Sequence, residues 1–160
     1  MSFNAGQAKP MDAAMALILT RAIWVALLFG QVAFAVVTVV LISAGELGDA
    51  TTLHPLLFYI SAAIFALAML VGGFVRNQIY KRSWRGHAVA PGGYVAGNVT
   101  YLALLEGAGL FGIITTLTTG VWAGMGVAGL AVAVQILNFP NGRAMRESPP
   151  PFAAREDQPG

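Results

Sequence analysis

The chain has 160 residues, of which 57% are hydrophobic and only 10% are charged, with a net charge of +2 and no cysteine. An average globular protein carries about 25% charged residues, so these charges are too few to coat a water-soluble domain. The hydrophobic content excludes disorder of the whole chain, and the lack of thiols excludes disulfides, thiolate metal sites and a cysteine nucleophile.

Four apolar stretches are long enough to cross a membrane, since a bilayer core of about 30 Å needs roughly 20 apolar residues of helix. In chain order they cover about residues 22–43, 56–74, 99–119 and 122–139. Each stretch is continuously apolar rather than alternating, which indicates helices and not barrel strands. We therefore predict an all-α membrane protein, with four transmembrane helices in residues 1–140 and a disordered, proline-rich cytoplasmic tail in residues 141–160.

The basic residues predict the orientation of these spans. None of them falls in the loop 44–55 or in the turn around Gly120, on one side of the membrane. Because loops rich in Lys and Arg stay cytoplasmic, we expect both termini in the cytoplasm. We expect the protein in the cell (inner) membrane. Since its basic residues lie at a membrane face, we expect no nucleic-acid partner. The other side holds all nine cations: Lys9, Arg21, Arg76, Lys81, Arg82, Arg85, Arg143, Arg146 and Arg155.

Four of these cations form a cluster between the second and third spans, namely Arg76, Lys81, Arg82 and Arg85. Near an anionic membrane surface each Lys or Arg contributes about 1 kcal/mol to binding, so the cluster is a candidate contact for anionic lipid. The alternative is that it only determines topology, as basic loops of multi-pass proteins do.

The chain contains an internal similarity. A shift of 77 residues aligns Ala26–Val40 with Ala103–Leu117 and gives six identities in fifteen positions. Duplication of a two-helix hairpin explains this, with the two hairpins parallel and related by an axis along the membrane normal. A chance match between helices built from few residue types is the alternative.

Two G-x-G-x-x-G patterns occur, at residues 107–112 and 124–129. Both lie inside spans rather than between a strand and a helix, so they do not indicate a dinucleotide site. In lipid, small residues let helix backbones approach closely. We therefore expect close helix packing, and an oligomeric face, at Ala26, Gly30, Ala103, Gly107, Gly112, Gly124 and Gly129.

Glu106 is the only acidic residue inside a predicted span. An ionised side chain inside a span costs a few kcal/mol or more, so Glu106 is expected to be a buried carboxylate that faces protein or water and not lipid. It is a functional candidate by default. Three roles are open: proton or ion coupling, structural hydrogen bonding or ion pairing, and binding of a ligand or partner. Its candidate polar partners are Gln135, Gln31, Arg21 and Arg76.

The sequence around this carboxylate, LALLEGAGLFGIITTL at residues 102–117, places Phe111 and Gly112 five and six positions after Glu106. In this it resembles the carboxylate-bearing helix of the proteolipid, or c, subunits of rotary ATP synthases. Arg76-Asn77-Gln78 is similar to the Arg-Asn/Gln-Pro loop of that family, with Gln78 in place of the proline. The resemblance implies that Glu106 carries protons, and the lack of a hydroxyl at positions 107 and 108 implies protons rather than sodium.

Other chemistry is sparse. The two histidines, His54 and His87, fall on opposite sides of the membrane in the predicted topology and lack metal-ligand spacing. No catalytic motif is present, so we expect neither an enzyme nor a bound cofactor or metal. The sequence predicts a non-catalytic subunit or homo-oligomer of a membrane assembly, in contact with lipids and with membrane-protein partners or further copies. A proteolipid-like, proton-translocating subunit that uses Glu106 is the alternative.

Overall fold

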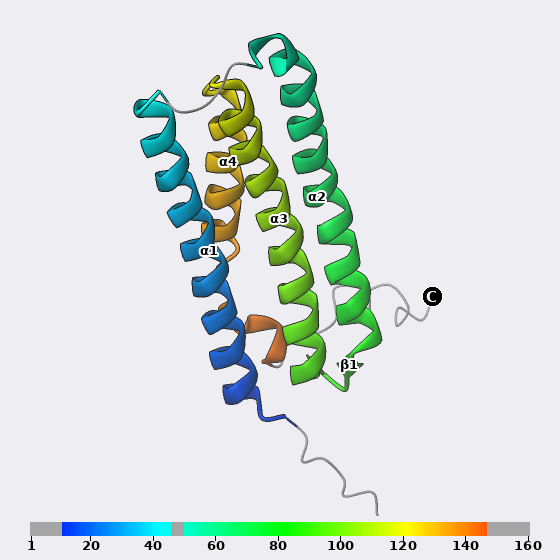
Figure 1. Cartoon of the computed structure of the whole chain (residues 1–160). Helices are drawn as coiled ribbons and strands as arrows, with labels where there is room; N and C mark the ends of the chain where they lie inside the picture. The colour runs from blue at the N-terminus through cyan, green and yellow to red at the C-terminus, as the bar shows by residue number, and fades with distance from the viewer. Residues whose placement is uncertain (1–10, 46–49, 147–160) are drawn as a thin grey trace, which may run out of the picture.

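The computed structural model describes residues 11–45 and 50–146. They form an all-α bundle, which confirms the predicted fold class (Figure 1). Two 3-10 turns, η1 (Thr51–Leu53) and η2 (Arg143–Met145), and a two-residue hairpin accompany the helices. The helices are α1 (Ala13–Ser43), α2 (His54–Arg82), α3 (Pro91–Thr119) and α4 (Ala123–Leu137).

Three of the helices are long and apolar enough to cross a membrane. α1 has 31 residues and α2 and α3 have 29 each, which gives lengths of about 45 Å at 1.5 Å per residue. α4 is apolar but has only 15 residues, so it is about 22 Å long and shorter than a hydrocarbon core of about 30 Å. α4 thus matches the fourth predicted span, 122–139, to within two residues at each end, but it is shorter than the other three helices.

The central helix of the bundle is α3, which packs against α1, α2 and α4. α1 and α2 lie on opposite sides of it (Figure 1). α1 and α3 run in one direction and α2 and α4 in the other, as in any up-and-down bundle. Of the two hairpins only α3–α4 is closely packed, because α1 and α2 are separated by α3.

The surface of the bundle is apolar and its interior is partly polar. Phe29, Leu70 and Leu137 are exposed by 74%, 74% and 84%, whereas Gln31 and Gln135 are almost fully buried. In water this distribution would expose large hydrophobic patches, but in lipid the exposed side chains are matched to their solvent and polar groups pair inside. The distribution therefore supports lipid as the surrounding medium.

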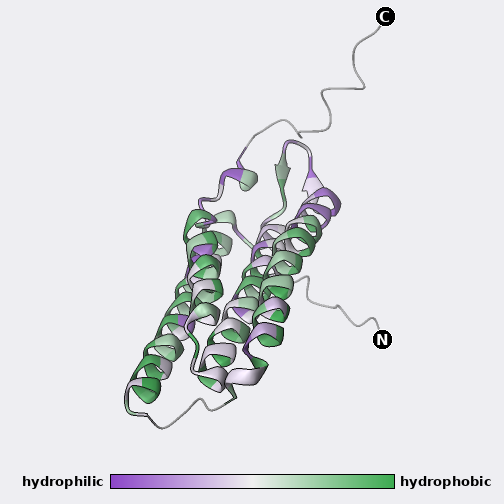
Figure 2. Cartoon of the chain, turned by 90° about the horizontal axis from the view of Figure 1, so that it is seen from above, coloured by the Kyte–Doolittle hydropathy of each residue, from purple (hydrophilic) through white to green (hydrophobic). Residues whose placement is uncertain are grey.

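Every Lys and Arg among the described residues lies toward the end of the bundle where α1 and α3 begin and α2 and α4 end. We call it the basic end. Figure 2 shows hydrophilic residues gathered there, around the hairpin and η2. The cations are Arg21, Arg76, Lys81, Arg82, Arg85, Arg143 and Arg146.

The segment between the second and third predicted spans is more regular than a loop. α2 continues to Arg82, strands β1 (Trp84–Arg85) and β2 (Ala88–Val89) pair as an antiparallel hairpin, and α3 begins at Pro91. Proline is favoured in the first helical turn, where its missing N–H has no intrahelical partner. Hydropathy marks the edge of the lipid-facing region, while helical hydrogen bonding continues through the interfacial polar residues beyond it.

The predicted tail begins as ordered structure. Residues 141–146 include η2, which packs against α3 and β2. Gly142 has φ +74°, a left-handed conformation that favours glycine. The rest of the predicted tail, residues 147–160, lies outside the described residues.

Candidate functional site

Glu106 lies near the midpoint of α3. It is fifteen residues from the first residue of the helix, Pro91, and therefore about 22 Å along the axis. α3 begins eight residues before the predicted span. Glu106 therefore lies near the middle of a helix that is long and apolar enough to cross a membrane.

The expectation that this carboxylate is buried is wrong, because Glu106 is only partly buried. Along residues 11–45 and 50–146 no acidic side chain is buried. The reason is local: the carboxylate lies over Gly30 of α1, where an added Cβ would stand 3.9 Å from Glu106 Oε1. Glycine has no side chain to cover the carboxylate, so the acid stays accessible from outside the bundle.

The two arginines predicted as partners of Glu106 bind elsewhere. The Arg21 Nε–H donates to the carbonyl of Pro140 at 3.1 Å, and its guanidinium stacks on Phe139 at 5.2 Å. Arg76 Nη1 donates to Asn138 Oδ1 at 3.2 Å. In the part of the chain that the structure describes, neither arginine forms an ion pair with Glu106, and both instead fasten the end of α4 to α1 and α2.

The two glutamines predicted as partners bind each other. Gln135 Nε2 on α4 donates to Gln31 Oε1 on α1 at 2.9 Å, and Gln31 Nε2 donates to the carbonyl of Ala128 at 3.3 Å. The contact depends on Gly109 of α3, because a Cβ at that position would overlap the Gln31 amide. Neither glutamine is joined to Glu106 by a hydrogen bond within the described ranges, so a buried amide pair, and not the carboxylate, connects α1 to α4.

A second polar contact joins the central helix to α2, and sequence reasoning missed it. The hydroxyls of Ser61 and Thr115 lie 2.7 Å apart and both are buried. Isolated hydroxyl residues in apolar spans are a weak signal, since each can also bond its own helix, as Ser61 does with the carbonyl of Leu57.

The predicted packing residues divide into two groups. Gly112 and Gly124 are buried against each other between α3 and α4, where a Cβ at Gly112 would stand 2.6 Å from the Gly124 carbonyl oxygen. The others are exposed at the surface of the bundle: Ala26, Gly30, Ala103, Gly107 and Gly129.

Four of these exposed residues surround the carboxylate. Ala26 and Gly30 lie one turn apart on α1, and Ala103 and Gly107 lie on α3 beside Glu106. A Cβ at Gly107 would meet nothing within 4 Å. We call Ala26, Gly30, Ala103, Glu106 and Gly107 the carboxylate face: a surface of small residues around one partly exposed acid.

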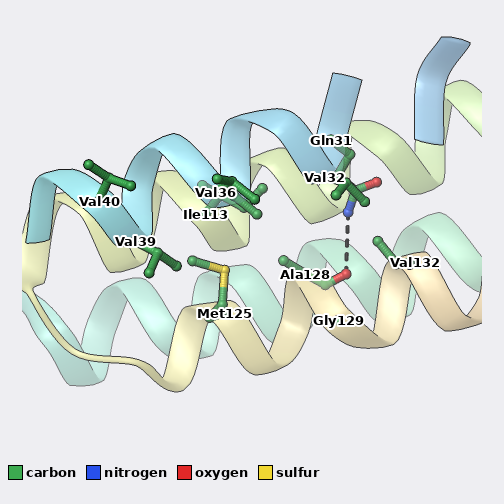
Figure 3. A pocket seen from close by; sticks show the side chains of 11 residues that line it. Gln31, Val32, Val36, Val39, Val40, Ile113, Met125, Ala128, Gly129 and Val132 are labelled. Carbon is green, nitrogen blue, oxygen red and sulfur yellow. Dashed lines mark hydrogen bonds between the residues drawn. The ribbon is translucent and has the colours of Figure 1, made fainter. Parts of the chain in front are cut away.

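An apolar groove of about 360 Å³ separates α1 from α4 in the half of the bundle away from the basic end. Figure 3 shows Val39 of α1 and Met125 of α4 pointing into the same space, with Gln31 at one end of it. The Gln31 amide is turned to the carbonyl of Ala128, so the groove is lined almost entirely by hydrocarbon.

The basic cluster is also divided. Lys81, Arg82 and Arg85 are exposed, whereas Arg76 is half-buried and stacks on the Tyr101 ring, with 4.4 Å between Cζ and the ring centroid. The exposed three lie on the surface of the basic end, while Arg76 belongs to its interior.

Comparisons of the chain with protein-family models, with curated proteins and with solved structures find no match. The site must therefore be interpreted from its own chemistry. That chemistry is a carboxylate near the middle of an apolar helix, on an open surface of small residues, beside a closed network of buried amides and hydroxyls.

Proposed function

We propose that the chain is a non-catalytic subunit of a membrane assembly and that the carboxylate face packs against a helix of a second copy or of another membrane protein. One observation carries this proposal. Glu106 is partly exposed near the middle of the apolar helix α3, and no hydrogen bond or ion pair satisfies it within the described ranges. A carboxyl group facing lipid is costly, whereas a neighbouring helix can supply a donor to it.

The residues around the carboxylate support the same interpretation. Close approach of helices in lipid depends on small residues, because lipid tails are as apolar as leucine and provide no hydrophobic driving force. Because Gly30 and Gly107 have no side chains, the backbone of a partner helix can approach Glu106 from the side of α1 and from the side of α3. By contrast, Gly112 and Gly124 are already used between α3 and α4.

Gly107→Leu is expected to disperse the native complex, because the leucine side chain would fill the space that a partner helix needs. Blue-native electrophoresis of protein extracted in mild detergent measures this. Gly126→Leu is the matched control: Gly126 is exposed on α4, and a Cβ there also meets nothing within 4 Å. An unchanged mass of the Gly107→Leu complex would refute docking at this face. Assembly of the purified chain alone would identify the partner as a second copy.

Proton translocation by Glu106 is the second candidate function. It is favoured by the position of the carboxyl group, which is at mid-depth and reachable from outside the bundle, so that it can exchange a proton with a neighbouring protein. The resemblance of residues 102–117 to the proteolipid helix supports the same role.

Glu106→Gln is expected to abolish proton flux into reconstituted vesicles and to leave the bundle folded, since glutamine has nearly the same shape and cannot carry a proton. Flux is measured with a pH-sensitive dye, and a hydrophobic carbodiimide should label the wild-type carboxyl group. Asp12→Asn, which removes an acid just before α1, is the control. Unchanged flux in Glu106→Gln would eliminate the translocation role, and the subunit role predicts only a mild effect of this substitution on assembly.

We also place the basic end in the cytoplasm, as the positive-inside rule requires. The chain has no cysteine, so single cysteines introduced at the exposed residues Thr52 and His87 report on opposite ends of the bundle. Labelling of Thr52→Cys, and not of His87→Cys, by an impermeant thiol reagent on intact cells is the expected result.

A further inference from the structure

A polar pocket of about 270 Å³ opens at the basic end. It lies between the last turns of α2, the first turns of α3 and the segment that follows α4. No Asp or Glu is among the described residues that line it, which include Arg76, Tyr80, Tyr94, Asn98, Asn138 and Arg143. Its charge is therefore positive and its walls are rich in hydrogen-bond donors.

The protein holds Arg76 in place without neutralising it. Stacking on Tyr101 fixes the plane of the guanidinium, and one N–H donates to the neutral amide oxygen of Asn138. A guanidinium has five N–H donors. The described part of the chain engages one of them in a hydrogen bond and provides no carboxylate partner. The guanidinium is therefore held in position with N–H donors available for a ligand.

The two pocket tyrosines are arranged as donors as well. Asn98 Nδ2 donates to the Tyr80 hydroxyl oxygen at 2.6 Å, and the Gly142 N–H donates to the Tyr94 hydroxyl oxygen at 3.0 Å. Each hydroxyl thus accepts a hydrogen bond, and its own proton is directed to no acceptor in the described residues. The rings stack with centroids 6.1 Å apart, and Asn98 and Tyr94 are buried, so the two O–H groups are held on a rigid wall.

We propose that this pocket binds the phosphate of an anionic phospholipid headgroup. A phosphate oxygen accepts several hydrogen bonds, and the planar guanidinium of arginine is suited to phosphate geometry. The pocket lies where membrane-spanning helices meet the interface, a level at which tyrosine side chains accumulate. Exposed Lys81 and Arg82 follow on the same helix end and favour an anionic lipid surface over a neutral one. The proposal is independent of docking at the carboxylate face.

A substitution of Arg143 distinguishes ligand binding from a structural role of the basic end. Arg76 lies beside Asn138, which follows the last turn of α4, and its charge also stabilises that helix terminus. Arg143 lines the same pocket but is exposed, and its guanidinium forms no hydrogen bond within residues 11–45 and 50–146. Its substitution therefore changes the charge of the pocket and leaves the bundle intact.

The test titrates dioctanoyl phosphatidylglycerol into the full chain in maltoside micelles and measures binding by native mass spectrometry. Arg143→Gln is expected to weaken binding about fivefold, the effect of losing one charge-assisted contact. Arg146→Gln removes the same charge from an exposed residue outside the pocket, and should change binding less than about twofold because surface charges contribute little. Tyr80→Phe keeps the ring and removes one donor, and should also weaken binding.

Three outcomes would overturn the proposal. Equal losses in Arg143→Gln and Arg146→Gln would show a diffuse surface effect instead of a pocket. Dioctanoyl phosphatidylcholine binding as tightly as phosphatidylglycerol would contradict selection for an anionic headgroup. Full competition by inorganic phosphate at an equal concentration would identify free phosphate, and not lipid, as the ligand.

Discussion

Gly112→Leu is expected to destabilise the bundle by about 3 kcal/mol, at the upper end of the usual cost of overpacking. A Cβ at this position would stand 2.6 Å from the Gly124 carbonyl oxygen and 3.1 Å from the Ala128 nitrogen. Both are backbone atoms of α4, so no side-chain rotation relieves the collision and the two helices must separate. The unfolding of purified protein by dodecyl sulfate, followed by circular dichroism, measures the loss.

Gly126→Leu is the control for this prediction, because it introduces the same side chain without a collision. A glycine inside a helix costs roughly 1 kcal/mol relative to a good helix former, so a leucine that meets no neighbour should stabilise α4 or leave it unchanged. Gly126 is such a position. If Gly112→Leu and Gly126→Leu unfold at the same detergent fraction, the tight α3–α4 contact does not exist.

Gln31→Leu is expected to cost about 2 kcal/mol and Gln135→Leu about 1 kcal/mol, within the range for buried polar groups that lose their partners. The asymmetry follows from the bonds that remain. Without Gln135, the Gln31 amide still donates to the carbonyl of Ala128. Without Gln31, the Gln135 amide has no side-chain hydrogen bond left among the described residues, since its Oε1 is already buried and unpaired.

The double substitution Gln31→Leu/Gln135→Leu should cost less than the sum of the single ones, because it strands no polar group. A double-mutant cycle of detergent unfolding gives this interaction free energy directly. Equal and additive costs would mean that the two amides do not interact. The buried hydroxyl of Thr38, which has no hydrogen-bond partner within the described ranges, offers Thr38→Val as a control of similar burial without a helix-to-helix hydrogen bond.

The helices of this fold could be predicted from the sequence because hydropathy and length are sufficient for that purpose. The four apolar stretches each form a helix, and the cations gather at one end of the described bundle. The ends of the helices could not be predicted in the same way. α2 continues to Arg82 and α3 begins at Pro91 because polar residues such as Gln78 and Asn98 extend a helix into the interface as readily as apolar ones.

The environment of Glu106 could not be predicted, because small and aliphatic residues occur on both the exposed and the buried side of α3 beside it. Ala103 and Gly107 are exposed while Leu105 and Ala108 are buried, and nothing in these residue types distinguishes the two sides. The pairing of Gln31 with Gln135 is easier to predict from the sequence, since neutral amides within spans are expected to bind across helices. The sequence identified both residues and assigned them the wrong partner.

The shortness of α4 has a consequence for the membrane itself. Its 15 residues leave it about 8 Å short of an average hydrocarbon core. Such a mismatch is relieved by local thinning of the lipid or by tilting, each at a modest free-energy cost per ångström. Lipids beside α4 should therefore be shorter or more disordered than those beside α1 and α2, and the protein should partition into thin bilayers in preference to thick ones.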